Sequence, residues 1–366
     1  MAGKPVILPD GCPPLTSYYV YLTGGCNLAC RHCWLSPTFE PGGDTGGHLP
    51  YEAFALAIEQ GLPLGLEHVK LTGGEPLLHP DLLRMVDLLR EKEVGLTIET
   101  NGTLLTRSLA RYLKDKSTLH FISLSLDGAT PESHDAFRGV KGSFDKTCQA
   151  IGYLVQVGYR PQVIMSLHQD NMGEIEPLVK LAEKLGAGSV KFSPVRPTGR
   201  GELMAQREQL LDIRRLIEMG RWVESELQKR TRLRLFFSWP LAFYGLQRLL
   251  ALDDYSCNVR NILGILPARH LALCGIGVQV PELCYGQLGE DLVADVWMSH
   301  PALIGLRQSV PADLEGICGR CIFRQRCLGM CVAENYHAAR RLTAPYWFCH
   351  EADKAGLFPR SRLLIV

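Results

Sequence analysis

Two periodicities of apolar positions alternate along roughly the first two hundred residues. Short apolar segments are followed by longer ones in which apolar residues recur every three or four positions. This pattern predicts strands at residues 18–23, 68–72, 95–100, 121–127, 161–168 and 190–193, and helices at 50–61, 81–92, 106–115, 144–157 and 174–185. Strand–helix–strand units are right-handed and build parallel sheets. We therefore expect an α/β fold, an incomplete barrel of six β/α units.

The predicted strands also carry a polar face. In segment 121–127, Ile or Leu alternates with Ser or Asp, and successive side chains of a strand point to opposite faces. Parallel strands covered on both faces are usually apolar throughout. Polar residues recur on one face of the other strands, at His68, Lys70, Thr72, Thr97, Glu99, Gln162, His168, Lys191 and Ser193. The pattern favours a barrel whose polar lumen holds a ligand; exposed edge strands are the alternative.

The periodic pattern changes after residue 201. Residues 202–229 are charged and mostly helical in pattern, and we expect them to lead from the barrel into a second domain. From residue 231 on, the chain is rich in Cys, Gly and Pro, which is typical of loops organised around metal rather than around a large apolar core. We predict a barrel domain at 13–230 and a loop-rich domain at 231–366.

Composition narrows the class of protein. The 366 residues, 46% hydrophobic and 21% charged, are typical of a globular chain and too many for one ordinary core. A net charge of +1 shows no basic surplus for a nucleic acid partner. The N-terminus lacks a signal-peptide pattern and no apolar run is long enough to cross a bilayer, so we expect a cytosolic protein without membrane contact.

Thirteen cysteines point to metal chemistry, because thiols in a reducing compartment seldom form disulfides. Cys26, Cys30 and Cys33 lie close together on a loop after the first predicted strand. A four-iron cluster usually takes four cysteines, so three thiolates would leave one iron open to an exchangeable ligand. A zinc site completed by His32 or His48 is the alternative.

These three cysteines, with three and then two residues between them, resemble the signature of the radical S-adenosylmethionine (SAM) superfamily, and the resemblance covers roughly residues 17–201. It implies that the cysteines hold a [4Fe–4S] cluster whose open iron is chelated by the amino and carboxylate groups of SAM. It also implies that one electron cleaves SAM to methionine and a 5′-deoxyadenosyl radical, which abstracts hydrogen from a substrate. A flavodoxin- or ferredoxin-type protein would donate the electron.

Further motifs carry the same resemblance. Gly73-Gly74-Glu75-Pro76, at the end of the second predicted strand, matches the family's Gly-Gly-Glu-Pro motif, in which the carboxylate accepts hydrogen bonds from an ammonium group. Arg138 would pair its planar guanidinium with the methionine carboxylate, or lie in a surface loop. Gly199-Arg200-Gly201 resembles the loop after the sixth strand. The predicted SAM-binding residues are Gly73, Gly74, Glu75, Pro76, Asn101, Ser123, Ser125 and Arg138.

A second group of cysteines lies near the C-terminus. Two residues separate Cys318 from Cys321, five separate Cys321 from Cys327 and three separate Cys327 from Cys331, and Cys349 follows. This spacing resembles the SPASM domain, an iron–sulfur extension of radical SAM enzymes that modify peptides. Eight thiols are enough for two more four-cysteine clusters, and so for three [4Fe–4S] clusters in all. The resemblance implies one cluster on Cys318, Cys321, Cys327 and Cys349, and another on Cys257, Cys274, Cys284 and Cys331.

The upstream half of this group departs from the SPASM pattern. Gln279 stands five residues before Cys284, where the family usually has glycine. The ligands of the second cluster therefore stay open, and that cluster could keep an open iron for substrate. A zinc ribbon built from the downstream cysteines is the alternative.

The SPASM resemblance implies a maturase that abstracts hydrogen from a ribosomally made peptide, to form a cross-link or thioether or to epimerise a residue. Alternatives are an enzyme of heme or cofactor synthesis, an anaerobic sulfatase maturase and an iron–sulfur electron carrier. Sulfatase maturases place Asp directly after an auxiliary cysteine, whereas Gly275 and Tyr285 stand there in this chain. Only about sixteen residues precede the first strand, so we expect a separate protein, or the barrel itself, to recognise any leader peptide.

Overall fold

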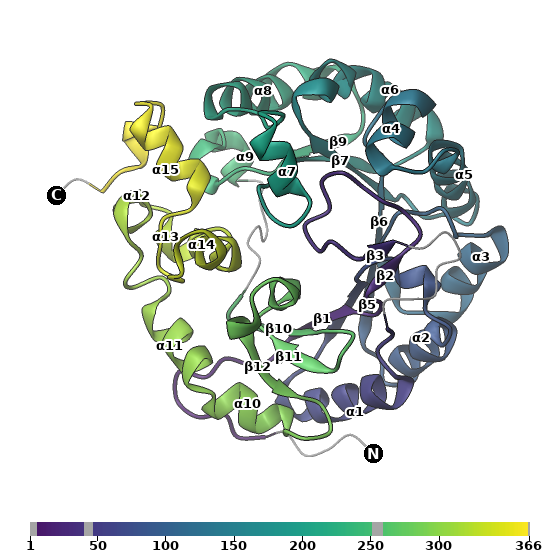
Figure 1. Cartoon of the computed structure of the whole chain (residues 1–366), viewed down its shortest axis with the longest axis vertical. Coiled ribbons are helices and arrows are strands. Elements are labelled where there is room, and N and C mark those ends of the chain that lie inside the picture. The colour runs from purple at the N-terminus through teal and green to yellow at the C-terminus, as the bar shows by residue number, and fades with distance from the viewer. Residues whose placement is uncertain (1–5, 40–46, 251–258, 365–366) are drawn as a thin grey trace.

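A computed structural model, which describes residues 6–39, 47–250 and 259–364, contains a mostly parallel sheet ringed by helices (Figure 1). Six parallel strands are neighbours in chain order: β1 (Ser17–Tyr21), β4 (His68–Thr72), β5 (Gly95–Thr100), β6 (Leu119–Ser125), β7 (Gln162–Leu167) and β8 (Ser189–Pro194). Each lies within two residues of its predicted position. The expected α/β fold with a partial six-unit barrel is confirmed.

Helices cover the outer side of these strands. They are α1 (Tyr51–Gly61), α2 (Leu82–Glu91), α3 (Arg107–Lys116), α5 (Ser143–Gln156) and α6 (Ile175–Leu185), with a short extra helix α4 (Pro131–Arg138) after β6. Apolar side chains of the strands, such as Val69, Ile98 and Val190, are buried with those of the helices in one core. The polar residues of the same strands consequently face inward.

The sheet continues at both edges beyond the six predicted strands. β9 (Arg234–Phe237) pairs in parallel with β8, and β10 (Ile262–Ile265) with β1. β11 (His270–Ala272) and β12 (Cys284–Gln287) extend the β10 edge antiparallel. A separate two-stranded sheet joins β2 (Gly25–Cys26) to β3 (Thr38–Phe39) in the cysteine loop. Strands from both sides of the predicted boundary at 230/231 share one sheet, and the two-domain division remains a prediction.

The region after the barrel is more helical than its sequence suggested. The helices after the barrel are α10 (Val293–Ser299), α11 (Pro301–Ser309), α12 (Gly316–Gly319), α13 (Arg324–Cys327), α14 (Val332–Ala339) and α15 (Trp347–Lys354). They occupy the left and lower left of the ring in Figure 1, across from the barrel helices α2 to α6. Trp297, Leu303 and Phe348 are buried in the same core as the barrel residues. The expectation of loops without a large apolar core was wrong, because helices this short show too little periodicity to be recognised.

The predicted helical stretch 202–229 is also interrupted. α7 (Gly201–Gln206) ends before α8 (Ile213–Ser225), whose first turn is capped by Asp212: its carboxylate accepts a hydrogen bond from the Arg215 amide at 2.8 Å. α9 (Leu246–Leu250) follows β9. Asp is a favoured N-cap residue, so the sequence did hold a signal for this break.

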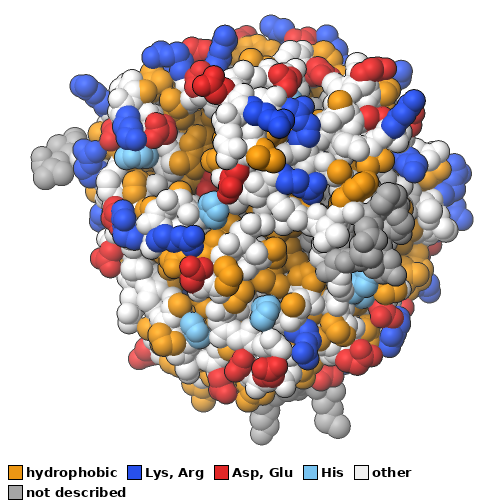
Figure 2. Space-filling model, viewed as in Figure 1, with side chains coloured by type: hydrophobic (Ala, Val, Ile, Leu, Met, Phe, Trp, Pro, Cys, Tyr) orange, Lys and Arg blue, Asp and Glu red, His pale blue; other side chains and the backbone are white. Residues whose placement is uncertain are grey.

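The distribution of charge on the surface and the character of the helices agree with what the composition indicated. Basic and acidic side chains are interspersed over the described part of the face seen in Figure 2 rather than gathered in one basic band. Among the described residues, no helix has the length and apolar character needed to cross a membrane.

Candidate functional site

The polar faces of the strands surround a cavity of about 450 Å³. Most of its strand-borne lining is polar, and the charged and hydroxyl side chains include Lys70, Thr72, Glu99, Thr100, Ser123, Ser125, Ser166, Lys191 and Ser193. The prediction of a polar lumen is confirmed, and the edge-strand alternative is wrong. Three further polar strand residues bond elsewhere: His68 to Thr97 (3.0 Å), Gln162 to Ser189 (3.1 Å) and His168 to its own helix cap.

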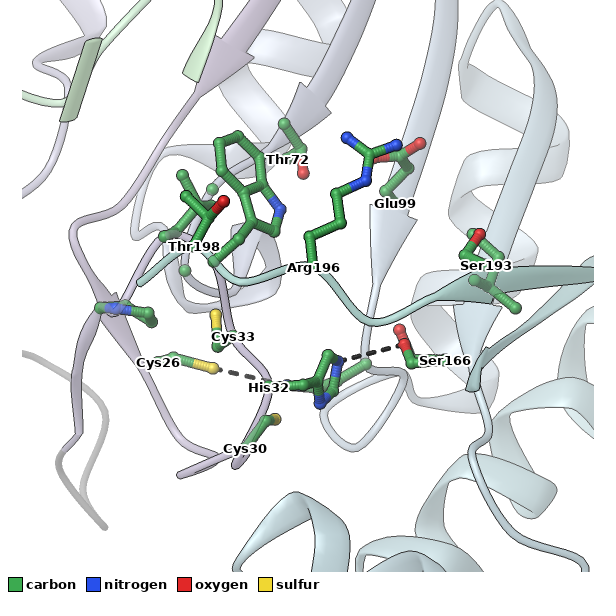
Figure 3. Close-up of a pocket in the computed structure, with 18 of the residues that line it drawn as sticks. Cys26, Cys30, His32, Cys33, Thr72, Glu99, Ser166, Ser193, Arg196 and Thr198 are labelled. Carbon is green, nitrogen blue, oxygen red and sulfur yellow. Dashed lines mark hydrogen bonds between the residues drawn. The ribbon is translucent and has the colours of Figure 1, made fainter. Parts of the chain in front are cut away.

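The three cysteines of the N-terminal loop, which we call the barrel cysteines (Cys26, Cys30 and Cys33), line the same cavity (Figure 3). Backbone hydrogen bonds tie their loop to three distant segments. The Glu75 amide donates to the Gly25 carbonyl (3.1 Å), the Ala29 amide to Arg138 (3.0 Å), and the Arg200 amide to Cys33 (3.0 Å). The sequence motifs around Glu75, Arg138 and Arg200 thus converge on one loop.

Two glycines explain why these segments can approach so closely. A Cβ at Gly74 would collide with the carbonyl of Gly25, and one at Gly139 would lie 2.8 Å from the carbonyl of Ala29. Gly139 also has a φ of +75°, which favours glycine. The glycines of the motifs therefore admit the cysteine loop itself.

The sulfurs of the barrel cysteines receive hydrogen-bond donors. The Leu28 amide donates to Cys26 Sγ and Arg138 Nη1 to Cys30 Sγ, both at 3.4 Å, while Asn101 Nδ2 lies 4.0 Å from Cys26 Sγ. Burial raises the pKa of Cys26 to about 12, and it also raises that of Cys30. A bound metal reverses this preference, because coordination deprotonates a thiol outright. Three convergent thiols with donors aimed at two of them fit an iron–sulfur cluster.

Glu75 is buried at the edge of the cavity and is largely occupied by the protein. Its carboxylate accepts hydrogen bonds from the Leu77 amide (3.0 Å), the Thr100 hydroxyl (2.5 Å) and the Asn101 amide (2.8 Å). Burial nevertheless raises its pKa. An ionised carboxylate offers about four acceptor positions, so roughly one remains for a ligand. Its neighbour Pro76, the fourth predicted motif residue, is buried and is not among the residues that line the cavity.

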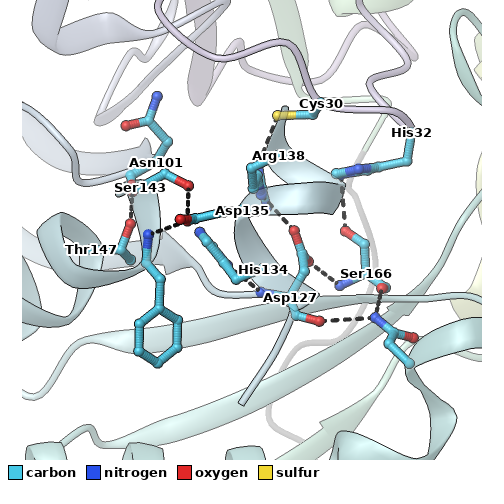
Figure 4. A network of polar contacts seen from close by, with 12 residues as sticks. Cys30, His32, Asn101, Asp127, His134, Asp135, Arg138, Ser143, Thr147 and Ser166 are labelled. Carbon is cyan, nitrogen blue, oxygen red and sulfur yellow. Dashed lines mark hydrogen bonds and ion pairs between the residues drawn. The ribbon is translucent and has the colours of Figure 1, made fainter. Parts of the chain in front are cut away.

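Arg138 sits in a buried polar network rather than in a surface loop (Figure 4). Its Nε pairs with Asp127 Oδ2 at 2.5 Å, and its Nη1 reaches Cys30. Asp127 Oδ1 accepts a hydrogen bond from the Ser166 amide (2.6 Å), and the Asp127 amide donates to His134 Nδ1 (3.1 Å). Burial would lower the pKa of Arg138, but Asp127 and Cys30 raise it above its ordinary value. The surface alternative for this arginine was wrong.

The cavity also contains residues that the sequence analysis missed. Arg196, on the loop after β8, pairs with Glu334 of α14 at 3.0 Å and points Nη1 at Cys331 Sγ, 3.8 Å away. Arg200 lines the cavity, and its Nε and Nη2 are buried without a hydrogen-bond partner among the described residues. The Gly199-Arg200-Gly201 segment was the only signal available for this loop.

Four thiols of the C-terminal region converge on a second, much smaller pocket of about 10 Å³. We call these four the C-terminal cysteines (Cys318, Cys321, Cys327 and Cys349). A hydrogen bond between Cys318 and Cys349 lowers the pKa of the first and raises that of the second. The grouping agrees with the predicted first auxiliary cluster, although a four-iron cluster needs more room, and this hydrogen-bonded pair would have to separate to hold one.

The remaining predicted ligands do not form one set in the structure. Cys274 and Cys331 line the barrel cavity. Cys284 begins β12 and its thiol faces the Gly277 carbonyl at 3.6 Å. Cys257 lies outside the described residues. The assignment of these four cysteines to one cluster therefore remains a prediction.

The described residues contain no ready site for the single zinc ion of the alternative interpretations. Zinc holds its sulfur ligands at about 2.3 Å from one ion, which brings them close together. Across residues 6–39, 47–250 and 259–364, no group of three or more His, Cys, Asp or Glu side chains is arranged to hold a single metal ion.

Comparisons with known proteins agree with this geometry. A sequence model of the Radical SAM superfamily matches residues 20–221. The chain is 28% identical to an AdoMet-dependent heme synthase of Nitratidesulfovibrio vulgaris, over 92% of each protein. It is also 28% identical to the mycofactocin maturase MftC of Mycobacterium tuberculosis, over 94% of this chain and 85% of MftC.

A solved structure shares the fold. Streptococcus suis SuiB, crystallised with the precursor peptide SuiA, superimposes with a TM-score of 0.71 at 17% identity, over 92% of this chain and 76% of SuiB. At this identity the likeness concerns the fold alone.

Proposed function

The chain belongs to the radical SAM superfamily, and on that basis we propose that it is a maturase that abstracts hydrogen from a ribosomally made peptide. Members of this superfamily are enzymes that bind SAM and a [4Fe–4S] cluster. The observation that carries the proposal is the group of C-terminal cysteines around one pocket, in a chain that resembles a peptide maturase over 94% of its length.

The barrel cysteines would hold the catalytic cluster at the mouth of the lumen. Bound there, a cluster with one open iron would supply the electron that cleaves SAM, and so the radical that attacks the substrate. The chain's own contribution is to fix the loop through Glu75, Arg138 and Arg200, and to enclose the reacting groups in a lumen away from bulk water.

Several of the residues predicted to bind SAM have polar groups that could form hydrogen bonds with it. Gly73, Gly74, Glu75, Asn101, Ser123, Ser125 and Arg138 all line the cavity with the barrel cysteines. The Ser123 hydroxyl is buried without a hydrogen-bond partner among the described residues, and Glu75 has about one acceptor position left. Arg138 uses Nε and Nη1 for contacts within the protein. Arg200, whose Nε and Nη2 have no hydrogen-bond partner among the described residues, is therefore a second candidate partner for the SAM carboxylate.

Three [4Fe–4S] clusters form part of this proposal. Anaerobically reconstituted protein should then contain about twelve irons per chain, at four per cluster. Near-stoichiometric zinc with little iron would reject it. The proposal also includes a flavodoxin- or ferredoxin-type donor, a separate leader-recognition protein, the domain division at 230/231 and a cytosolic location.

A heme-pathway activity is the second candidate, because the heme synthase relative is as similar to this chain as MftC. The test is co-expression with the short peptides encoded near the gene, read by mass spectrometry. Loss of about two mass units would indicate a cross-link, and uptake of one solvent deuteron would indicate epimerisation, by the logic of hydrogen abstraction. If no peptide changes while a small metabolite drives formation of 5′-deoxyadenosine, the peptide assignment is wrong.

A further inference from the structure

A groove of about 210 Å³ lies beside the loop of barrel cysteines, and the function proposed above makes no use of it. We call it the loop groove. It is bounded by that loop, by the segments that follow the Gly-Gly-Glu-Pro motif and β5, and by the start of α5. The described residues that line it are Asn27, Leu28, Phe39, Leu78, Thr103, Leu104, Val140, Lys141, Ser143 and Lys146. Leu28 also lines the barrel cavity, so at this point the cysteine loop is the wall between the two spaces.

Two short routes connect the loop groove with Cys26. In the first, Leu28 lines the groove and its amide donates a hydrogen bond to Cys26 Sγ at 3.4 Å. In the second, Asn27 Nδ2 donates to the Thr103 hydroxyl in the groove (2.8 Å), and Asn27 Oδ1 accepts from Asn101 Nδ2 (2.9 Å). The same nitrogen of Asn101 lies 4.0 Å from Cys26 Sγ. Because electron transfer weakens steeply with distance, this side of the loop offers a short path to a cluster held by Cys26.

The loop groove combines apolar and basic side chains. Phe39 and Leu104 are large hydrophobic residues that remain exposed, at 38% and 36%. Lys141 and Lys146 are also exposed, and neither forms an ion pair with another described residue. No carboxylate is among the described residues that line the groove. Exposed apolar side chains next to charges of one sign are typical of a surface that receives another macromolecule.

Two carboxylates lie close to these lysines in the sequence, and both act elsewhere. Asp135 caps the start of α5, where its carboxylate accepts hydrogen bonds from the amides of Gly142 (2.6 Å) and Phe144 (2.8 Å). Burial and, to a smaller extent, Asp145 raise the pKa of Cys148 to about 11, so the charge of Asp145 acts on the part of α5 that bears this cysteine. The groove therefore presents a positive charge that an acidic partner would complement.

We propose that a small acidic electron-carrier protein docks on the loop groove and reduces the cluster held by the barrel cysteines. One electron leaves the reduced carrier, which is oxidised, and reaches the cluster, which is reduced; no other group is transferred. This deepens the proposed function, on which the presence of that cluster rests. SAM and substrate would occupy the lumen on the other side of Leu28, so a docked carrier would not block them. Small interfaces with complementary charges are typical of transient electron-transfer pairs.

The test compares two reductants of the anaerobically reconstituted holoenzyme with SAM. One is a reduced bacterial flavodoxin, an acidic carrier that must dock, and the other is excess dithionite, a small ion that needs no docking surface. The rate of 5′-deoxyadenosine formation is measured against flavodoxin concentration. In the double variant Lys141→Glu, Lys146→Glu, the KM for flavodoxin should rise by about tenfold or more, because an acidic partner is now repelled. The rate with dithionite should not change.

A matched control and a change of salt locate the effect. Lys184→Glu, at an exposed lysine in the last turn of α6, reverses a charge away from the groove and should leave the KM for flavodoxin unchanged. Raising the salt from about 0.05 to about 0.3 M should slow the flavodoxin reaction of the unaltered enzyme several-fold, and that of the double variant far less. Lys146→Glu lies in the first turn of α5, where an acidic residue is favourable, so the helix should be preserved.

Three results would overturn the proposal. If the double variant keeps the KM of the unaltered enzyme for flavodoxin, the carrier docks elsewhere, for example near the C-terminal cysteines. If the rate with dithionite falls as far as the rate with flavodoxin, the two lysines act on the catalytic site rather than on docking. Failure of the proposed function itself would be seen separately, as absence of 5′-deoxyadenosine from the unaltered enzyme with either reductant, and it would remove the reason for a docking site as well.

Discussion

The barrel cysteines and the C-terminal cysteines lie in opposite surroundings. The first group opens into a cavity of about 450 Å³ whose lining includes many charged and hydroxyl side chains. The second bounds a space of about 10 Å³ whose other walls are mainly apolar, among them Leu314, Ile317 and Phe358. A space of 10 Å³ holds about one water molecule. One site is built to admit exchangeable molecules and the other to exclude them.

This difference assigns different tasks to similar residues. The loop of barrel cysteines is held by hydrogen bonds at the edge of a polar lumen, so a ligand bound there can be reached by substrate. A group bound by the C-terminal cysteines would lie among mainly apolar side chains, where it could exchange electrons or support the fold. Cys274 and Cys331, which line the large cavity, are better placed for contact with substrate.

The largest effect is expected from removing the barrel cysteines. The triple variant Cys26→Ala, Cys30→Ala, Cys33→Ala should lose about four irons, keep the remaining eight or so, and form no 5′-deoxyadenosine. Iron analysis and chromatography of the reduced enzyme with SAM measure both outcomes. Cys148→Ala, at a half-buried cysteine of α5, is the control and should lose no iron. If the triple variant still cleaved SAM, the barrel cysteines would not be the site of SAM cleavage.

A smaller loss of activity and a larger loss of stability are expected at the C-terminal cysteines. Cys318→Ala should release up to four irons and lower the free energy of unfolding by several kcal/mol, because the energy of metal binding is also folding energy. Formation of 5′-deoxyadenosine should persist in the protein that remains folded. Thermal unfolding and the cleavage assay, run on one preparation, measure the two effects. Unchanged stability with complete loss of SAM cleavage would show that this site takes part in catalysis.

Glu75 tests how far the large cavity depends on its buried network. Glu75→Ala leaves the Leu77 amide, the Thr100 hydroxyl and the Asn101 amide without their acceptor, at about 1–3 kcal/mol for each buried donor. We expect lower stability together with SAM binding weakened by tenfold or more. Glu75→Gln keeps one acceptor oxygen, so its stability and its affinity for SAM should lie between those of the unaltered protein and those of Glu75→Ala. Calorimetric titration with SAM decides; full affinity in the alanine variant would remove Glu75 from the site.

The smallest effect is expected at Glu224, which lies on α8 away from both cysteine groups. Burial raises its pKa to about 7, against a hydrogen bond from Trp239 Nε1 at 3.2 Å. A raised pKa in the folded state means that ionisation destabilises the fold, so stability falls as the pH rises from about 4.5 through 7. Glu224→Gln should raise the melting temperature by about 1–2 °C at pH 8 and leave it unchanged at pH 4.5.

Glu224→Gln also serves as a control for the variants of the two cysteine groups. Iron content and SAM cleavage should match the unaltered protein at both pH values, since Glu224 touches neither cysteine group. A gain in stability at pH 4.5 equal to that at pH 8 would mean that ionisation of this carboxyl is not the cause.

The barrel was more predictable than the C-terminal region for a physical reason. Strands and helices of the barrel are long enough to show their periods, so β4 and β5 were located to the residue. α12 and α13 span four residues each, less than a period pattern requires, and their burial depends on contacts with the barrel core. The metal-rich composition of this region was visible, but its packing was not.

For the candidate site too, the sequence indicated some residues, while their contacts became known only from the structure. Clustered thiols are a local signal and pointed to the barrel cysteines and the C-terminal cysteines, whereas the Gly-Gly-Glu-Pro motif and the set of four C-terminal ligands came from the resemblance to the radical SAM and SPASM families. The residues that contact these side chains could not be predicted from the sequence. Arg138 was assigned to a ligand or to the surface, and the structure pairs it with Asp127 and Cys30. Of the polar strand residues that the sequence placed on the lumen face, Lys70, Glu99 and Lys191 line the cavity, whereas His68, Gln162 and His168 do not.

The sequence by itself therefore determined the order of strands and helices, the polar lumen and the chemistry of its cysteines, since these depend on local periodicity and residue type. Only the tertiary structure decided that Gly74 and Gly139 make room for the cysteine loop, and that Glu75 and Arg138 are engaged within the protein. It alone also separated an open cysteine site from a closed one. Such pairings join residues many positions apart, and their geometry is set by the packing of the whole chain.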